Sequence, residues 1–93
     1  MINLNIEPQN NLDLYIFGSS IVSDTYNDID LAIIYDKNAI DIDKAINYRK
    51  MLKMELSEKF NCPIDILLLS KDEEIQTEFL TNAKHEIVYT TTK

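Results

Sequence analysis

Residues 12–35, LDLYIFGSSIVSDTYNDIDLAIIY, contain two apolar runs separated by a polar segment that opens with the only glycine of the chain. The run Leu12–Phe17 is apolar and aromatic and ends at Gly18, which is typical of a buried strand that enters a tight turn. The run Ile29–Tyr35 is rich in β-branched and aromatic residues and predicts a second strand. The intervening Ser19–Asn27 is expected to be a loop that holds one short helical turn.

Downstream of these strands the apolar pattern changes to a helical period. The segment Asp41–Phe60 carries apolar residues three or four positions apart and predicts the main helix. Pro63 follows it, and the nearly continuous apolar run Ile64–Leu69 is typical of a central strand covered by helices. Ile87–Thr90 predicts a short edge strand, and Thr90–Lys93 is expected to be a frayed tail.

The segment Ser70-Lys71-Asp72-Glu73 has the spacing of a capping box, in which the Ser and Glu side chains satisfy each other's backbone N–H groups. A second helix is expected to start there and to turn four apolar side chains inward: Ile75, Phe79, Leu80 and Ala83. Together these elements predict a small α+β fold with a mixed central sheet of three to four strands and flanking helices, mainly on one face.

The composition indicates one acidic domain, expected to span residues 1–93. Its 45% hydrophobic content supplies a core of the size at which small domains fold alone. The net charge of −7 lacks the basic footprint of a protein that binds long DNA or RNA. An acidic chain that handles an anionic substrate needs a local counter-charge, and a divalent cation would supply it.

The single cysteine, Cys62, excludes an internal disulfide and leaves no Cys/His cluster for structural zinc. The segment Met1–Asn11 has no basic region followed by an apolar stretch, so no secretory signal is expected there. The longest apolar runs are too short to span a bilayer. These features predict a cytoplasmic protein.

Three aspartates are the candidate catalytic residues. Side chains at positions i and i+2 of a strand point to the same side, so Asp28 and Asp30 share a face. Asp65, between Ile64 and Ile66, repeats this arrangement on another strand. Clustered carboxylates repel one another, and such a cluster usually binds a hard cation or shares a proton. Mg²⁺ suits these oxygen ligands together with substrate phosphates.

The turn Gly18-Ser19-Ser20 is the candidate phosphate site. Glycine lets backbone N–H groups approach a phosphate, and a short helix after it would direct its positive end there. The turn and the metal would then hold the same triphosphate.

Each of these residues also has a purely structural interpretation. Asp28 and Asp30 would only solvate the start of a strand, Gly18 would be a plain turn glycine, and Asp65 an exposed strand residue. His85 is expected to be a surface residue. The basic residues are expected to form a solvated helix face, although one of them could contact a phosphate: Lys37, Lys44, Arg49, Lys50 and Lys53.

The order of three motifs, Phe17-Gly18-Ser19, Asp28-Ile29-Asp30-Leu31 and Ile64-Asp65-Ile66, resembles the nucleotidyltransferase superfamily related to DNA polymerase beta. The short chain is similar to the minimal nucleotidyltransferases of that superfamily, of the antitoxin type. The resemblance covers Tyr15–Leu69 and implies a nucleotidyltransferase-like fold for the domain.

The resemblance also implies roles for individual residues. In the family the Gly-Ser turn binds the nucleotide triphosphate, the Asp-x-Asp pair holds metal ions, and a third Asp completes the site and helps to deprotonate the acceptor hydroxyl. For this chain it implies nucleotide binding by Gly18, Ser19 and Ser20, and two Mg²⁺ ions held by Asp28, Asp30 and Asp65, with Asp65 as third ligand or base.

The function that the resemblance implies is transfer of a nucleoside monophosphate, AMP from ATP, to a hydroxyl of a partner protein such as a HEPN-type toxin. Two departures from the family leave alternatives open. The segment between Ser19 and Asp28 is short and lacks the usual Arg and second Gly, which favours a module that neutralises a partner by contact alone. About a dozen residues precede the first strand, where relatives commonly carry a helix, so a partner or self-association would cover that face. Transfer to a small molecule is a third possibility.

Overall fold

The computed structural model describes residues 4, 6–18 and 28–92. The helical turn expected within Ser19–Asn27, and the proposed phosphate contacts of Ser19 and Ser20, lie outside these residues. The elements follow one another as β1 (Leu12–Phe17), β2 (Ile29–Tyr35), α1 (Ile42–Phe60), β3 (Ile64–Ser70), α2 (Lys71–Thr77), α3 (Phe79–Asn82) and β4 (His85–Thr90).

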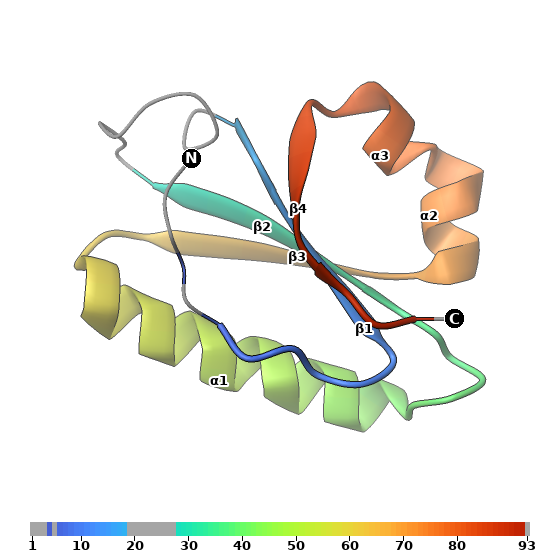
Figure 1. Cartoon of the computed structure of the whole chain (residues 1–93), viewed down its shortest axis with the longest axis horizontal. Helices are drawn as coiled ribbons and strands as arrows, with labels where there is room; N and C mark the ends of the chain where they lie inside the picture. The colour runs from blue at the N-terminus through green and yellow to red at the C-terminus, as the bar shows by residue number, and fades with distance from the viewer. Residues whose placement is uncertain (1–3, 5, 19–27, 93) are drawn as a thin grey trace.

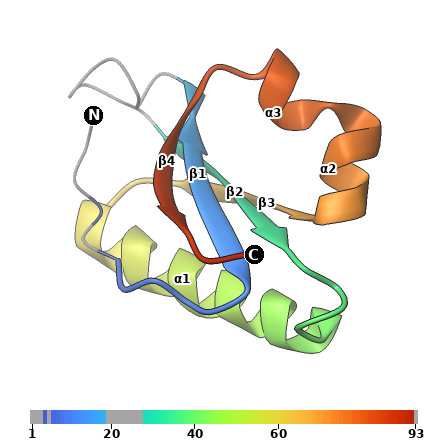
Figure 2. The same cartoon turned by 45° about the vertical axis from the view of Figure 1, so that its right-hand side comes forward.

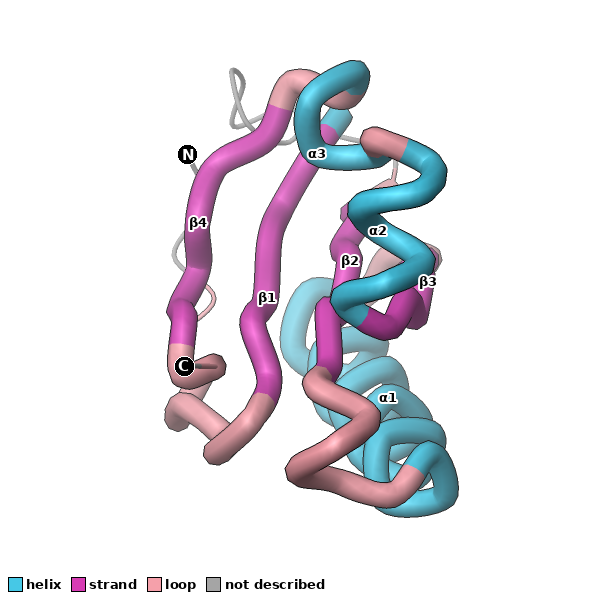
Figure 3. Tube along the Cα trace, turned by 90° about the vertical axis from the view of Figure 1, so that its right-hand side faces the viewer, coloured by secondary structure: helices cyan, strands magenta, loops and turns pink. Residues whose placement is uncertain are grey.

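The strands form one mixed sheet in the order β3-β2-β1-β4, which confirms the predicted α+β architecture (Figure 3). β1 pairs antiparallel with β2 and with β4, and β2 pairs parallel with β3. The prediction that Ile64–Leu69 forms a central strand was wrong, because β3 lies at an edge of the sheet. Its apolar run reflects contacts with helices on both faces, α1 and α2, rather than strands on both sides.

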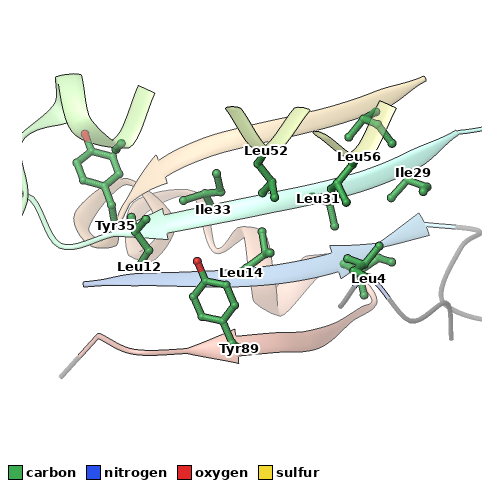
Figure 4. Close-up of a cluster of buried hydrophobic side chains, with 13 residues drawn as sticks. Leu4, Leu12, Leu14, Ile29, Leu31, Ile33, Tyr35, Leu52, Leu56 and Tyr89 are labelled. Atoms are coloured by element: carbon green, nitrogen blue, oxygen red, sulfur yellow. The ribbon is translucent and has the colours of Figure 1, made fainter. Parts of the chain in front are cut away.

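One face of the sheet packs against α1 and forms the core. Alternate residues of β1 and β2 point to this face, and none of them is exposed: Leu12, Leu14, Ile16, Ile29, Leu31 and Ile33. Leu52 and Leu56 of α1 meet them, as Figure 4 shows. The helical period in Asp41–Phe60 therefore predicted both the helix and its buried side. Asp41 is the N-cap, and Asn61 closes the helix in the left-handed conformation (φ 51°).

α2 and α3 lie against the opposite face, so the expectation that helices cover mainly one face was wrong (Figure 1, Figure 2). The ring of Phe79 in α3 meets that of Phe17 in β1 edge to face, with 5.2 Å between the ring centroids. The capping box is confirmed, because the Glu73 backbone N–H donates to Ser70 Oγ and the Ser70 N–H donates to Glu73 Oε1.

The single helix expected after Ser70 is broken in two at Glu78, which adopts a left-handed conformation (φ 52°). The break changes the direction of the chain, so the helical period does not continue across it. Ile75, within α2, is 69% exposed, and its predicted inward position was wrong. Phe79 and Leu80, beyond the break, are half-buried.

The expected frayed tail is instead attached to the sheet through Asp13, a buried aspartate of β1. The backbone N–H groups of Thr91 and Thr92 donate to Asp13 Oδ1, and the Thr92 hydroxyl donates to Oδ2. β4 itself begins at His85, two residues before the predicted strand. Hydrogen bonds to charged groups are stronger than neutral ones, which explains why so short a tail is held.

Candidate active site

The three candidate aspartates lie where β2 and β3 begin. Asp28 directly precedes β2, Asp30 is its second residue, and Asp65 is the second residue of β3. The parallel register places Asp30 opposite Asp65, and the antiparallel register places Phe17 opposite Asp30. Residues paired in this way share a face of the sheet. The Ile29 N–H donates to the Pro63 carbonyl at 3.0 Å, which fixes the two strand starts to each other.

The structure brings the three carboxylates together. One carboxylate oxygen from each of Asp28, Asp30 and Asp65 lies within 4.8 Å of the other two. Asp28 and Asp30 are half-buried, and Asp65 is exposed. Oxygen ligands at this spacing form a donor set that suits a hard divalent cation such as Mg²⁺. The cluster therefore fits a metal on its geometry and on its chemistry.

The electrostatics of the cluster also favour a bound cation. Burial raises the pKa of Asp30 above its ordinary value, and the negative charges of Asp28 and Asp65 raise it further. A cation between the carboxylates would remove this repulsion and favour the ionised forms. The cluster is thus electrostatically unfavourable by itself and complementary to positive charge.

Gly18 lies against this cluster. Its φ of +81° is a conformation that residues with a Cβ rarely adopt. A Cβ built at Gly18 would lie 2.7 Å from Asp30 Oδ2, well inside van der Waals contact. The backbone conformation therefore favours glycine here, and any larger residue would also force the Asp30 carboxylate to shift.

A cleft of about 530 Å³ extends from the cluster along the edge of the sheet. Its walls include Phe17, Asp65 and Leu67 from the strands, and Arg49, Lys50 and Lys53 from α1. These three cations were predicted to belong to a solvated helix face. The spacing of Ile46, Arg49, Lys50 and Lys53 at helical intervals was the signal that they share one side of α1.

Two other side chains of reactive types, Cys62 and His85, do not belong to the acidic cluster. Burial raises the pKa of the Cys62 thiol, and the negative charge of Asp28 raises it further, which disfavours the nucleophilic thiolate. His85 is half-buried rather than a plain surface residue. Its Nδ1 donates to the Ala83 carbonyl at 2.8 Å, and its ring meets that of Tyr15 edge to face.

In the described part of the chain, no helix combines the length and the apolar character needed to cross a membrane. Searches among curated proteins and among solved structures find no match to the chain. The family described as Polymerase beta, Nucleotidyltransferase matches residues 4–92, nearly the whole chain. This span includes β1 with its glycine turn, the strand starts that carry the three aspartates, and all the helices. The chain therefore belongs to the polymerase beta nucleotidyltransferase family.

Proposed function

We propose that this protein transfers a nucleoside monophosphate, AMP from ATP, to a hydroxyl group, and that Asp28, Asp30 and Asp65 form its catalytic centre. Family membership supports nucleotidyl transfer in general. The observation that carries the assignment of the site is the convergence of three carboxylate oxygens within 4.8 Å, beside a glycine at which a Cβ would lie 2.7 Å from Asp30 Oδ2.

In this proposal Asp28, Asp30 and Asp65 hold two Mg²⁺ ions, and Gly18, Ser19 and Ser20 bind the triphosphate. Bound Mg²⁺ would supply positive charge to the phosphate oxygens and orient the reacting groups. The position of Gly18 supports the second assignment, since it directly follows β1 and lies next to Asp30.

The reaction would be an in-line displacement at the α-phosphorus. The acceptor oxygen attacks, the bond from the α-phosphorus to the bridging oxygen of the β-phosphate breaks, and pyrophosphate leaves. Asp65 takes the proton of the acceptor hydroxyl, a role that its exposed position at the open side of the cluster allows.

For the acceptor we propose a hydroxyl of a partner protein such as a HEPN-type toxin, which would make this chain an antitoxin. The net charge of −7 disfavours a nucleic acid as the acceptor. The resemblance to minimal nucleotidyltransferases supports the same class of acceptor.

Intact-mass spectrometry tests the proposal. The chain and the product of the neighbouring gene are incubated with each nucleoside triphosphate and Mg²⁺, beside the double variant Asp28→Asn, Asp30→Asn. A nucleotide-sized mass gain on either protein, absent with the variant, is the expected result. A stable complex of the two proteins with no mass gain would contradict transfer and favour a module that acts by contact alone.

A further inference from the structure

The side of α1 that faces β3 carries a basic stripe, Arg49, Lys50 and Lys53. These residues and Ile46 lie at intervals of three and four, so they project from one side of the helix. They line the same cleft as Asp65 of the acidic cluster. The stripe is therefore next to the candidate catalytic centre.

The three cations of the basic stripe have no acidic partner within the described residues. Lys37 pairs with Asp72, and both residues lie outside the cleft. A chain with a net charge of −7 has a large excess of carboxylates to pair with its cations. The clustering of three unpaired cations along one cleft makes this part of the surface complementary to a negatively charged ligand.

Asp65 is the member of the acidic cluster that lines the cleft together with the basic stripe. In the sheet order β3-β2-β1, Asp65 lies on β3, Asp30 on β2, and Gly18 follows β1. Phe17, which directly precedes Gly18, also lines the cleft, so the cleft extends from the β3 edge toward the expected triphosphate site. A ligand on the stripe would approach Asp65, the residue proposed to accept the proton of the acceptor hydroxyl.

The cleft also has an apolar part and an open strand edge. Ile46 is 37% exposed and Leu67 is 39% exposed. β3 is the outer strand and has no partner on its other side within the described part of the chain. An edge strand offers backbone N–H and C=O groups to an extended peptide. Asp65 is the second residue of this edge strand, so a peptide along the edge would lead to the proposed catalytic centre.

We propose that this cleft binds the acceptor protein through an extended acidic segment, whose carboxylates contact Arg49, Lys50 and Lys53 and whose apolar side chains contact Ile46 and Leu67. A hydroxyl at the end of that segment reaches Asp65. The proposal rests on the proposed function, because it assigns the acceptor of the same reaction.

Fluorescence anisotropy with two labelled peptides tests the binding. Both peptides contain the same leucines and one tyrosine, and they differ only in carrying either glutamates or lysines between them. The net charge of the protein alone favours the lysine peptide, whereas the proposal predicts that the glutamate peptide binds at least about fivefold more tightly. Tighter binding of the lysine peptide, or no binding of the glutamate peptide, would overturn the proposal.

Two charge reversals on α1 localise the effect. Lys53→Glu lies in the cleft, and Lys44→Glu, an exposed residue of the same helix outside the cleft, changes the net charge equally. We expect Lys53→Glu to weaken glutamate-peptide binding roughly fivefold more than Lys44→Glu does. Equal effects would overturn the proposal, as would an oligouridylate that competes more strongly than the glutamate peptide, since it would assign the cleft to nucleic acid.

The two proposals can fail separately. If the glutamate peptide binds through Lys53 but no nucleotide is transferred to the peptide or to the neighbouring protein, the docking site stands and the proposed reaction falls. If transfer to the neighbouring protein proceeds at the same rate in the Lys53→Glu and Lys44→Glu variants, the reaction stands and the docking site falls.

Discussion

The two faces of the sheet are made from alternate residues of the same strands, and they differ in what they hold. On the α1 face, Leu14 and Ile16 of β1 and Leu31 of β2 are completely buried. On the other face, Asp13, Tyr15 and Phe17 alternate with them, and Asp30 and Asp65 form the acidic cluster. One face is closed by the long helix α1. On the other face, against which α2 and α3 lie, Ala32 and Ile34 are buried, whereas Asp30 is half-buried and Asp65 is exposed.

We call the α1 face the closed face, and the face with the acidic cluster the open face. Packing on the closed face explains how the open face can hold like charges close together. Asp30 lies between Ile29 and Leu31, and both neighbours are fully buried on the other side of β2. Their packing fixes the backbone of Asp30 and therefore the direction of its carboxylate. A site held within about half an ångström of its working geometry needs this kind of support. Stability and chemistry thus come from adjacent residues of one strand.

Substitution of Asp30 should impair the proposed catalytic centre on the open face and leave the stability of the fold intact. Asp30→Asn is expected to lower transfer about a thousandfold, equivalent to about 4 kcal/mol, because it removes a proposed metal ligand. Its thermal midpoint without Mg²⁺ should rise slightly, since the raised pKa of Asp30 shows that its charge is disfavoured in the fold. Transfer assays and thermal unfolding measure both effects.

Glu58→Gln, an exposed residue of α1, is the control for Asp30→Asn because it removes one negative charge outside the acidic cluster. Mg²⁺ should raise the thermal midpoint of the wild type and of Glu58→Gln but not that of Asp30→Asn. Retention of full transfer by Asp30→Asn would show that the acidic cluster is not the catalytic centre.

Truncation of Leu31 should destabilise the packing of the closed face. Leu31→Ala leaves a cavity between β2 and α1 and is expected to lower the free energy of unfolding by about 2–5 kcal/mol. Leu67→Ala, on β3 and 39% exposed, is the matched substitution on the open side, and we expect it to cost about 1 kcal/mol or less. Urea unfolding of the two variants compares the faces directly, and equal losses would contradict the distinction between them.

The closed face could be predicted from sequence because it depends on local periods. The apolar, aromatic and β-branched runs Leu12–Phe17 and Ile29–Tyr35 predicted both strands with their observed bounds, and the period of Asp41–Phe60 predicted the helix that covers them. Because alternate side chains of a strand point to opposite faces, Asp28 and Asp30 were predicted to share the face away from Ile29 and Leu31. Asp65 was predicted to join them because Ile64 and Ile66 flank it in the same way on another strand.

The parts that were not predicted depend on long-range packing. An apolar run such as Ile64–Leu69 does not distinguish a strand between two strands from one between two helices, so the edge position of β3 was missed. The left-handed residue that ends α2 is Glu78 and not a glycine, so the sequence carries no sign of the break. The helix was therefore predicted to continue. The basic stripe was assigned to solvent because only the three-dimensional structure places β3 beside it.

Gly18 directly follows β1 and lies next to Asp30, so its substitution should affect both the stability of the fold and the acidic cluster. Gly18→Ala is expected to cost about 1–2 kcal/mol for its positive φ, and its Cβ would displace the Asp30 carboxylate. Gly18→Asn separates the two causes, because asparagine tolerates the left-handed conformation but keeps the Cβ. Weak Mg²⁺ binding in both variants, with a smaller stability loss in Gly18→Asn, is expected by calorimetry. Normal Mg²⁺ binding in both would contradict the contact with Asp30.

The smallest effect concerns the pH dependence of the closed face. Tyr89 Oη donates to Tyr48 Oη at 2.9 Å beneath α1, and burial is the main cause that raises the pKa of both phenols. A folded-state pKa above the unfolded value of about 10 means that this contribution is complete below pH 10 and declines as pH rises above it. The decline is at most about 1.4 kcal/mol per pH unit for each phenol, and less for the half-exposed Tyr48.

Tyr48→Phe should cost about 1 kcal/mol at neutral pH and flatten the loss of stability between about pH 10 and 11. Urea unfolding across this range measures the slope, and an unchanged slope would show that the hydroxyl pair does not contribute to the stability of the closed face.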